Sequence, residues 1–345
     1  MSLWKGPEVD GITQSLLSKF IVCRERFKLL VIDGLVSAPR FSHALEYGNM
    51  WHLCEECLAN KQPYEGKLKE YAQELAKEYP LQSADVEKWY QVCRLQFPIY
   101  VQYWKKHPDV KKREPLYAED TFSEPIELPS GRIVRLRGKF DSVDAMPNAR
   151  GRKKGIYLQE NKTKGEINEQ EVANQLLWDL QTGTYLVALR ARCRREGIDL
   201  PVSGVRYNVI RRPLAGGRHS IRPFKPTKSN PRGETSSQFY VRLAGLIKGE
   251  PEFFFMRWRV EFTEKNIDDF ERLCLYPILE MLWDWWEWIN LSSEDQGELV
   301  NSFHYRYPYG VWNPMDRSGV GELDQYMNNG SKLGLVVTDN LYKEL

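Results

Sequence analysis

Two strand-like stretches separated by a short polar loop constrain the fold of this chain more than any other feature. Residues 131–146 read GRIVRLRGKFDSVDAM, residues 155–162 read GIYLQENK, and the loop between them reads PNARGRKK. If the loop is symmetric, the numbers of facing residues sum to 301, because Met146 then faces Gly155. Asp141 would therefore face Glu160, with Cβ atoms roughly 4.5–5.5 Å apart.

Like charges that face each other across a hairpin destabilise it unless a cation lies between them. Mg²⁺ is commonly held by one or two carboxylates together with water and phosphate oxygens. Lys162 follows Glu160 by two positions, so both side chains point to the same face of a strand. The hairpin predicts either a metal site beside a catalytic cation or an ordinary solvated strand end, and the short D…E-x-K pattern alone does not separate these.

The rest of the 345-residue chain favours an α/β protein with a mixed sheet. Apolar residues recur at three- and four-residue spacings between residues 13 and 107, which predicts helices. Strand patterns fill 116–162, a helix is expected over 169–196, and VSGVRYNVIRR (202–212) predicts another strand. The net charge of +2 implies that any nucleic-acid binding depends on an uneven charge distribution.

The composition also indicates the cellular compartment in which the protein is expected. No apolar run approaches the roughly 18 residues of a membrane span, so we expect no membrane association. The N-terminus MSLWKGPEVDG has no signal-peptide core, and six cysteines in a chain of this length indicate reduced thiols. We therefore expect a cytoplasmic protein.

Two further pairs of residues accompany the hairpin. Gln181 and Tyr185 are four apart in the helix after it, and Gly48 and His52 are four apart in an earlier helix. Each has an ordinary structural interpretation, since a histidine on an amphipathic helix or a tyrosine in TYLVAL can simply pack. Three other acids near the predicted strands are interpreted as surface charges. They are Glu119, Glu124 and Asp144.

Four ordered motifs, G-x-x-x-H (48–52), G-x-x-D (138–141), E-x-K (160–162) and Q-x-x-x-Y (181–185), resemble the PD-(D/E)XK nuclease superfamily. Within it they resemble the RecB-like branch of phage and CRISPR-adaptation exonucleases, over about residues 13–215. The resemblance implies a restriction-endonuclease-like core, a central mixed β-sheet flanked by helices. It implies one nuclease domain spanning 1–345, with a helical part (1–112), a sheet core (113–213) and a C-terminal part with a basic loop, helices and aromatic residues (214–345).

The same resemblance implies a hydrolase that uses Mg²⁺ or Mn²⁺ to cleave phosphodiester bonds. The implied metal ligands are His52, Asp141, Glu160 and the backbone carbonyl of Asn161. Lys162 would orient or help to deprotonate the attacking water, while Gln181 and Tyr185 would position Lys162 or the DNA strand.

Some relatives carry an iron–sulfur cluster, which needs four thiolates or close substitutes. Cys23 matches the first ligand, but no cysteine follows Leu275, so we expect no cluster. Cys54 and Cys57 have metal-like spacing without a second pair. We expect residues 305–312 to pack on the N-terminal helices instead, and the tryptophan-rich stretch 277–291 to be a core helix.

Residues 206–233 contain eight lysines and arginines and no acid, so we expect a DNA-contacting element built as a hairpin and an extended loop. Besides Arg206 and Arg232, its basic residues are Arg211, Arg212, Arg218, Arg222, Lys225 and Lys228.

The leading hypothesis is a DNA exonuclease, or an enzyme that processes ends or single strands, in phage or bacterial recombination, repair or defence. The alternatives are a non-catalytic nucleic-acid-binding subunit on a degenerate nuclease fold and a hydrolase acting on another substrate. The chain has no G-x-x-x-x-G-K-[ST] phosphate loop, so a helicase or recombination protein would be a separate partner.

Overall fold

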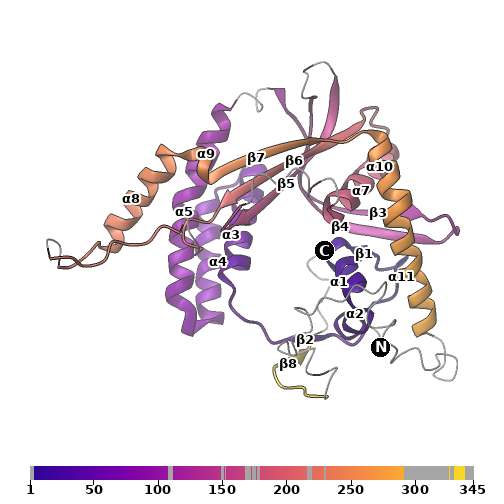
Figure 1. Ribbon diagram of the computed structural model, residues 1–345, viewed down its shortest axis with the longest axis horizontal. Coiled ribbons are helices and arrows are strands. Elements are labelled where there is room, and N and C mark those ends of the chain that lie inside the picture. Colours follow the sequence, from indigo (N-terminus) through magenta and orange to yellow (C-terminus); the bar gives the residue numbers. More distant parts are fainter. Residues whose placement is uncertain are drawn as a thin grey trace.

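The computed structural model describes most of the chain in helices, strands and connecting loops (Figure 1). The described residues are 4–107, 112–148, 151, 153–167, 172, 176, 179–215, 220–228, 231–290, 326 and 330–338.

The N-terminal part is helical, as the apolar spacing predicts. Thr13 and Ser42 cap the helices that follow them by accepting hydrogen bonds from the backbone NH groups of Leu16 and Leu45. The helices are α1 (Gln14–Val22), α2 (Arg24–Val31), α3 (His43–Ala59), α4 (Tyr64–Glu78) and α5 (Ser83–Lys106).

A six-stranded mixed sheet forms the centre of the molecule, which confirms the expected fold class. The order is β1-β4-β5-β6-β7, and β3 pairs with β4; β1–β4 and β5–β6 are parallel and the other pairs are antiparallel. The strands are β1 (Ile12–Thr13), β3 (Glu114–Glu127), β4 (Ile133–Pro147), β5 (Lys154–Lys164), β6 (Val202–Arg211) and β7 (Phe255–Glu261). A separate pair joins β2 (Leu35–Ser37) to β8 (Leu335–Val337).

The register predicted for the β4–β5 hairpin is confirmed. Met146 pairs with Gly155, and the pairing continues to Ser142 and Gln159. The next positions along the two strands are Asp141 and Glu160.

The two faces of the sheet bury different kinds of side chain. On β6, Val205 and Val209 belong to the core under α1, α2, α7 (Leu180–Glu196) and α11 (Tyr276–Ile289). Arg206 and Asn208 alternate with them and point to the face covered by α3 and α5, where both are buried. Because buried polar side chains need partners, this second face holds a hydrogen-bond network.

Helix α7 connects β5 to the parallel strand β6 and sets the position of Gln181. Asp179 caps it by accepting hydrogen bonds from the backbone NH and the hydroxyl of Thr182, both at 2.8 Å. The helix ends at Gly197, which has a φ of 68°. Most of the expected helical residues before Asp179 lie outside the described residues.

The C-terminal part adds α8 (Ser236–Gly249), α9 (Pro251–Phe254), α10 (Glu264–Phe270) and a π-helical turn, Glu271–Leu275, before α11. Helix α11 packs in the core, as predicted, with Trp285 3% exposed and Trp286 against Trp4. In Figure 1, α8 and the loop before it extend away from the sheet. The segment 305–312, predicted to pack on the N-terminal helices, lies outside the described residues.

All six cysteines are free thiols in the structure, and five of them are buried. Among the described residues, no helix is both long and apolar enough to cross a membrane.

Candidate active site

The predicted site residues gather where β4 and β5 separate. One edge of β4 pairs with β3, whereas the other pairs with β5 from Ser142 onward and with β1 only at Leu136 and Arg137. Asp141 therefore lies in a gap between two pairing partners. Its Oδ2 accepts a 2.7 Å hydrogen bond from the backbone NH of Asn161 across the gap. The carboxylate is thus held at a break in the sheet, where backbone pairing leaves room for a ligand.

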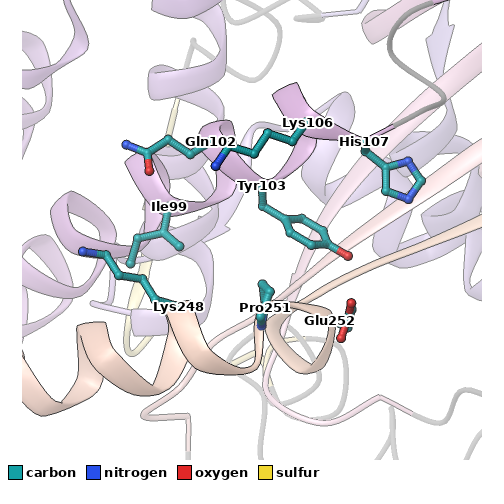
Figure 2. Close-up of a pocket in the computed structure, with 8 residues that line it drawn as sticks. All are labelled: Ile99, Gln102, Tyr103, Lys106, His107, Lys248, Pro251 and Glu252. Atoms are coloured by element: carbon teal, nitrogen blue, oxygen red, sulfur yellow. The ribbon is translucent and has the colours of Figure 1, made fainter.

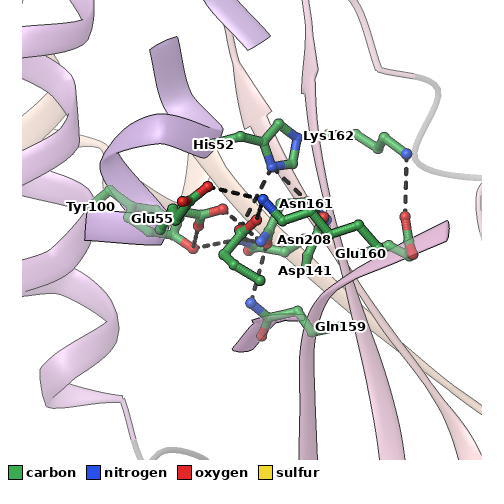
Figure 3. Close-up of polar contacts among 12 residues, drawn as sticks. His52, Glu55, Tyr100, Asp141, Gln159, Glu160, Asn161, Lys162 and Asn208 are labelled. Atoms are coloured by element: carbon green, nitrogen blue, oxygen red, sulfur yellow. Dashed lines mark hydrogen bonds and ion pairs between the residues drawn. The ribbon is translucent and has the colours of Figure 1, made fainter. Parts of the chain in front are cut away.

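Three side chains from three elements form a group with metal-ligand spacing at this gap. The Nδ1 atom of His52, on α3, lies 3.7 Å from Asp141 Oδ1 and 3.9 Å from Glu119 Oε1 (Figure 3). One ligand atom from each of the three residues lies within 4.8 Å of the others. The approach of a helical histidine to Asp141, which sequence motifs suggested, is therefore present.

Glu119 is a site residue that the sequence analysis did not identify. Its side chain is 3% exposed, so the interpretation as a surface charge is wrong. Glu119 also has a φ of 50°, a left-handed conformation that is uncommon for a residue other than glycine. It lies on β3 beside Asp141 on β4, between the pairs Ala118–Ser142 and Asp120–Phe140. Such backbone strain recurs at functional sites.

The other two acids predicted as surface charges are buried as well. Glu124 is 2% exposed and its Oε1 is 2.8 Å from Arg195 Nη2. Asp144 is fully buried between Arg206 and Arg113. An alternating strand pattern could not reveal these arginine partners, because they come from other elements.

Glu160, Lys162 and Gln181 form a second group beside the first. Lys162 Nζ is 3.2 Å from Glu160 Oε2 and donates a 3.1 Å hydrogen bond to Gln181 Oε1. Gln181 Nε2 donates in turn to Glu160 Oε2 at 2.9 Å. Glu160 Oε2 is therefore occupied by Lys162 and Gln181, whereas its buried Oε1 has no hydrogen-bond partner among the described residues.

The electrostatics of both groups reflect buried negative charge. Burial raises the pKa of Glu160 to about 7 and that of Asp141 above its ordinary value. Burial alone would lower the pKa of His52, but Glu119, Asp141 and Glu55 outweigh it and raise that pKa to about 9. Burial likewise opposes the charge of Lys162, but Glu160 and Asp141 raise its pKa above the ordinary value.

Asn161 connects the site to the buried polar network. Its Nδ2 donates a 2.6 Å hydrogen bond to Glu55 Oε2, and its Oδ1 accepts from Asn208 Nδ2 at 2.9 Å. Glu55 also accepts a 3.0 Å hydrogen bond from the hydroxyl of Tyr100, and burial raises the pKa of this carboxyl to about 8. Glu55 follows His52 by three positions on α3, and that helical spacing was the only signal in the sequence that could have identified it.

Tyr185 lies against β3 and β4, where its ring contacts Phe122 and Phe140 edge-on. Burial raises the pKa of its hydroxyl to about 12. A Cβ atom at Gly138 would lie 2.6 Å from Phe122 and 3.1 Å from the Tyr185 hydroxyl. Glycine at this motif position therefore lets the tyrosine approach β4.

The basic segment after β6 is divided between buried and exposed positions. Arg206 is 1% exposed and pairs with Asp144, so its interpretation as a phosphate contact is wrong. Arg211 is also buried, with its guanidinium over the Phe253 ring and donating to the Phe253 carbonyl, so the structure does not present it to DNA as predicted.

The remainder of this segment has neither helix nor strand in its described residues, so the predicted hairpin is absent there. Arg212 Nη1 lies 3.2 Å from His43 Nδ1. Arg222, Lys225 and Lys228 are exposed, and Arg218 lies outside the described residues.

Two recesses flank the C-terminal half of α5. One, of about 410 Å³, is lined by Glu119, Asp141 and Asn161 and therefore opens onto the candidate site. The other, of about 380 Å³, lies between the end of α5 and α8–α9 and is lined by Tyr103 and Lys248 (Figure 2). No motif residue lines this second recess, so only the first of the two borders the candidate site.

The donor set fits a hard divalent cation. It offers one imidazole nitrogen and two carboxylates, and Glu119 Oε1 is buried without a hydrogen-bond partner among the described residues. Carboxylate oxygens are preferred by Mg²⁺ and Mn²⁺, and imidazole is also a ligand for transition metals.

Comparison with known proteins agrees with this chemistry. The family model of the PD-(D/E)XK nuclease superfamily matches residues 12–273, well over half of the chain. No curated protein matches the sequence.

Proposed function

This chain belongs to the PD-(D/E)XK nuclease superfamily, and we propose that it is a Mg²⁺- or Mn²⁺-dependent deoxyribonuclease that degrades DNA from ends or processes single strands. The observation that carries the proposal is the group of His52, Glu119 and Asp141 beside a half-buried lysine, Lys162, at a break in the sheet. A scaffold protein has no need of this arrangement, because burying several carboxylates together is costly.

His52, Glu119 and Asp141 would hold the metal, with Glu160 and the Asn161 carbonyl as further ligands if the Glu160 carboxylate turns from Lys162. A divalent ion held there supplies Lewis-acid charge to the scissile phosphate. Negative charge on these residues is otherwise offset by a proton on His52, whose pKa is about 9, and by Lys139, whose Nζ lies 3.0 Å from Glu119 Oε2.

Lys162 acts as a positive charge and hydrogen-bond donor in this proposal. Its raised pKa keeps the ammonium protonated, so it stabilises charge that develops on the phosphate oxygens instead of accepting a proton from water. Gln181 fixes the ammonium by accepting its hydrogen bond. Tyr185 supports this arrangement from the core, where it positions β4.

The exposed cations of residues 222–228 would bind the DNA backbone away from the reacting phosphate. They lie on the loop that extends with α8 from the sheet (Figure 1). Exposed lysines and arginines of this kind neutralise phosphates without reading sequence. Recombination, repair or defence in a phage or bacterium would suit such an enzyme, with a separate helicase or recombination protein as partner.

The test is cleavage of end-labelled linear and circular DNA, single- and double-stranded, with Mg²⁺, Mn²⁺ or EDTA. We expect metal-dependent hydrolysis that is fastest on linear DNA. Activity that survives EDTA would contradict the metal site, and absence of cleavage on all substrates would contradict the enzymatic proposal.

A further inference from the structure

The recess that opens onto the active site has a floor of buried polar side chains. It contains Ser142, Gln159 and Asn161 on neighbouring strands, each less than 10% exposed. A protein interior rarely places amides and hydroxyls along a sheet face unless they have partners to satisfy. The volume, about 410 Å³, lies within the range of roughly 300–1,000 Å³ that is usual for small-ligand sites.

The guanidinium of Arg113 lies in this recess and forms an ion pair through only one of its nitrogens with a described residue. Arg113 Nε lies 3.1 Å from Asp144 Oδ1, whereas Asp144 Oδ2 is paired with Arg206. The two terminal nitrogens of Arg113 make no hydrogen bond or ion pair with other described residues, and the side chain is 27% exposed. One buried carboxylate thus faces two guanidinium groups.

Two further cations line the same recess. Lys105 is exposed and has no ion pair among the described residues, and Arg257 stacks 3.6 Å over the Trp104 ring. Leu58 and Val101 provide an apolar wall.

The recess therefore has a negative end and a positive end. Glu119 and Asp141 form the negative end, where the metal would bind. Asp144, which anchors Arg113, lies three residues further along β4, a distance of roughly 10 Å. The two ends are far enough apart to hold two different phosphate groups of one strand.

We infer that the positive end binds a terminal phosphate monoester of the DNA substrate, so that the terminal nucleotide occupies the recess while the next phosphodiester lies at the metal site. This inference rests on the proposed function and specifies its substrate as a phosphorylated strand end.

Charge favours a terminal phosphate over an internal one. A phosphate monoester carries about −1.5 to −2 charges near pH 7, whereas each backbone diester carries one. The free fork of Arg113 suits bidentate binding of phosphate oxygens. The size of the recess suits one nucleotide and not a passing strand.

The experiment compares single strands of one sequence that carry a 5′-phosphate, a 3′-phosphate or hydroxyls at both ends. Binding is measured by fluorescence anisotropy in EDTA, and kcat/KM is measured with Mg²⁺. We expect one phosphorylated end to be preferred over hydroxyl ends by roughly ten- to a hundredfold, the scale of charge-assisted hydrogen bonds. Preference for the strand with a 5′-phosphate or for the strand with a 3′-phosphate identifies which strand end is bound.

Arg113→Gln should remove most of this preference, while Asp144 keeps its pair with Arg206. Lys105→Gln, at an exposed position where folding is not at risk, should reduce it several-fold. Arg94→Gln is the matched control, since it removes one exposed charge from the same helix outside the recess.

Equal binding and cleavage of all three strands would overturn the inference and leave the nuclease proposal intact. A preference that survives both Arg113→Gln and Lys105→Gln would overturn it too. A preference seen in binding without any cleavage would support the pocket and contradict the catalytic proposal.

Discussion

Replacing Glu119 with glutamine tests whether this residue shares a charge centre with His52. Glu119 Oε1 lies 3.9 Å from His52 Nδ1. At that distance, two unit charges attract by about 4 kcal/mol at an effective dielectric constant of about 20, and by about 1 kcal/mol in bulk water. His52 is 37% exposed, so solvent screening places the real value between these limits.

One pKa unit corresponds to about 1.4 kcal/mol, so the loss of Glu119 should lower the pKa of His52 by between about 1 and about 3. The parent value is about 9. Asp141, at 3.7 Å, remains in place and keeps part of the shift. We therefore expect the variant histidine to titrate between about 6 and about 8.

The assay is an NMR pH titration of the imidazole C–H signals in EDTA. The chain has five histidines, and a His52→Gln spectrum identifies the signal of interest. Asp120→Asn is the matched control, because Asp120 is the next residue on β3 and pairs with Arg192 instead. Calorimetry should show Mn²⁺ affinity reduced at least about tenfold in Glu119→Gln, because a hard-cation site depends on the number of charged ligands. An unchanged His52 pKa together with unchanged Mn²⁺ affinity would refute the role of Glu119.

Three further predictions concern the reaction and its substrate. Lys162→Ala should abolish cleavage but preserve DNA binding in EDTA, and activity within a few-fold of the parent would contradict its role. Mn²⁺ affinity should rise with pH between about 7 and about 9, because Glu160 and His52 have pKa values of about 7 and about 9 and a bound metal requires their deprotonated forms; calorimetry that finds a flat profile would contradict this coupling. Alanine at the three exposed cations of 222–228 should lower the log–log salt slope of DNA binding by two or more, and an unchanged slope would exclude this loop as the DNA surface. These cations are Arg222, Lys225 and Lys228.

The hairpin at the centre of the site was predictable because its determinants are local. Alternation of side chains and the length of the loop together set the register, and the structure confirms the pairing from Met146–Gly155 to Ser142–Gln159. The same holds for the N-terminal helices, whose apolar spacing and capping residues act within one or two turns.

Local pattern failed where two strands part. The register expected for a symmetric loop places Asp141 opposite Glu160. Pairing between β4 and β5 instead ends one residue earlier, and β1 pairs with the same edge of β4 at Leu136. Glu160 then contacts Lys162 and Gln181, while Glu119 comes beside Asp141. No spacing in the sequence predicts that Glu119 replaces Glu160 beside Asp141, because this depends on which strand pairs with each edge of β4.

Periodicity, caps and turn lengths are short-range properties, so the amino-acid order is enough to predict the helices, the strands and the residue types that are available for catalysis. Which charges are buried depends on the folded arrangement, which pairs Arg206 with Asp144 and places Arg113 in a recess beside the candidate metal ligands. The energy of a charge depends on its surroundings in space, because burial and a partner from a distant strand set its pKa and its accessibility.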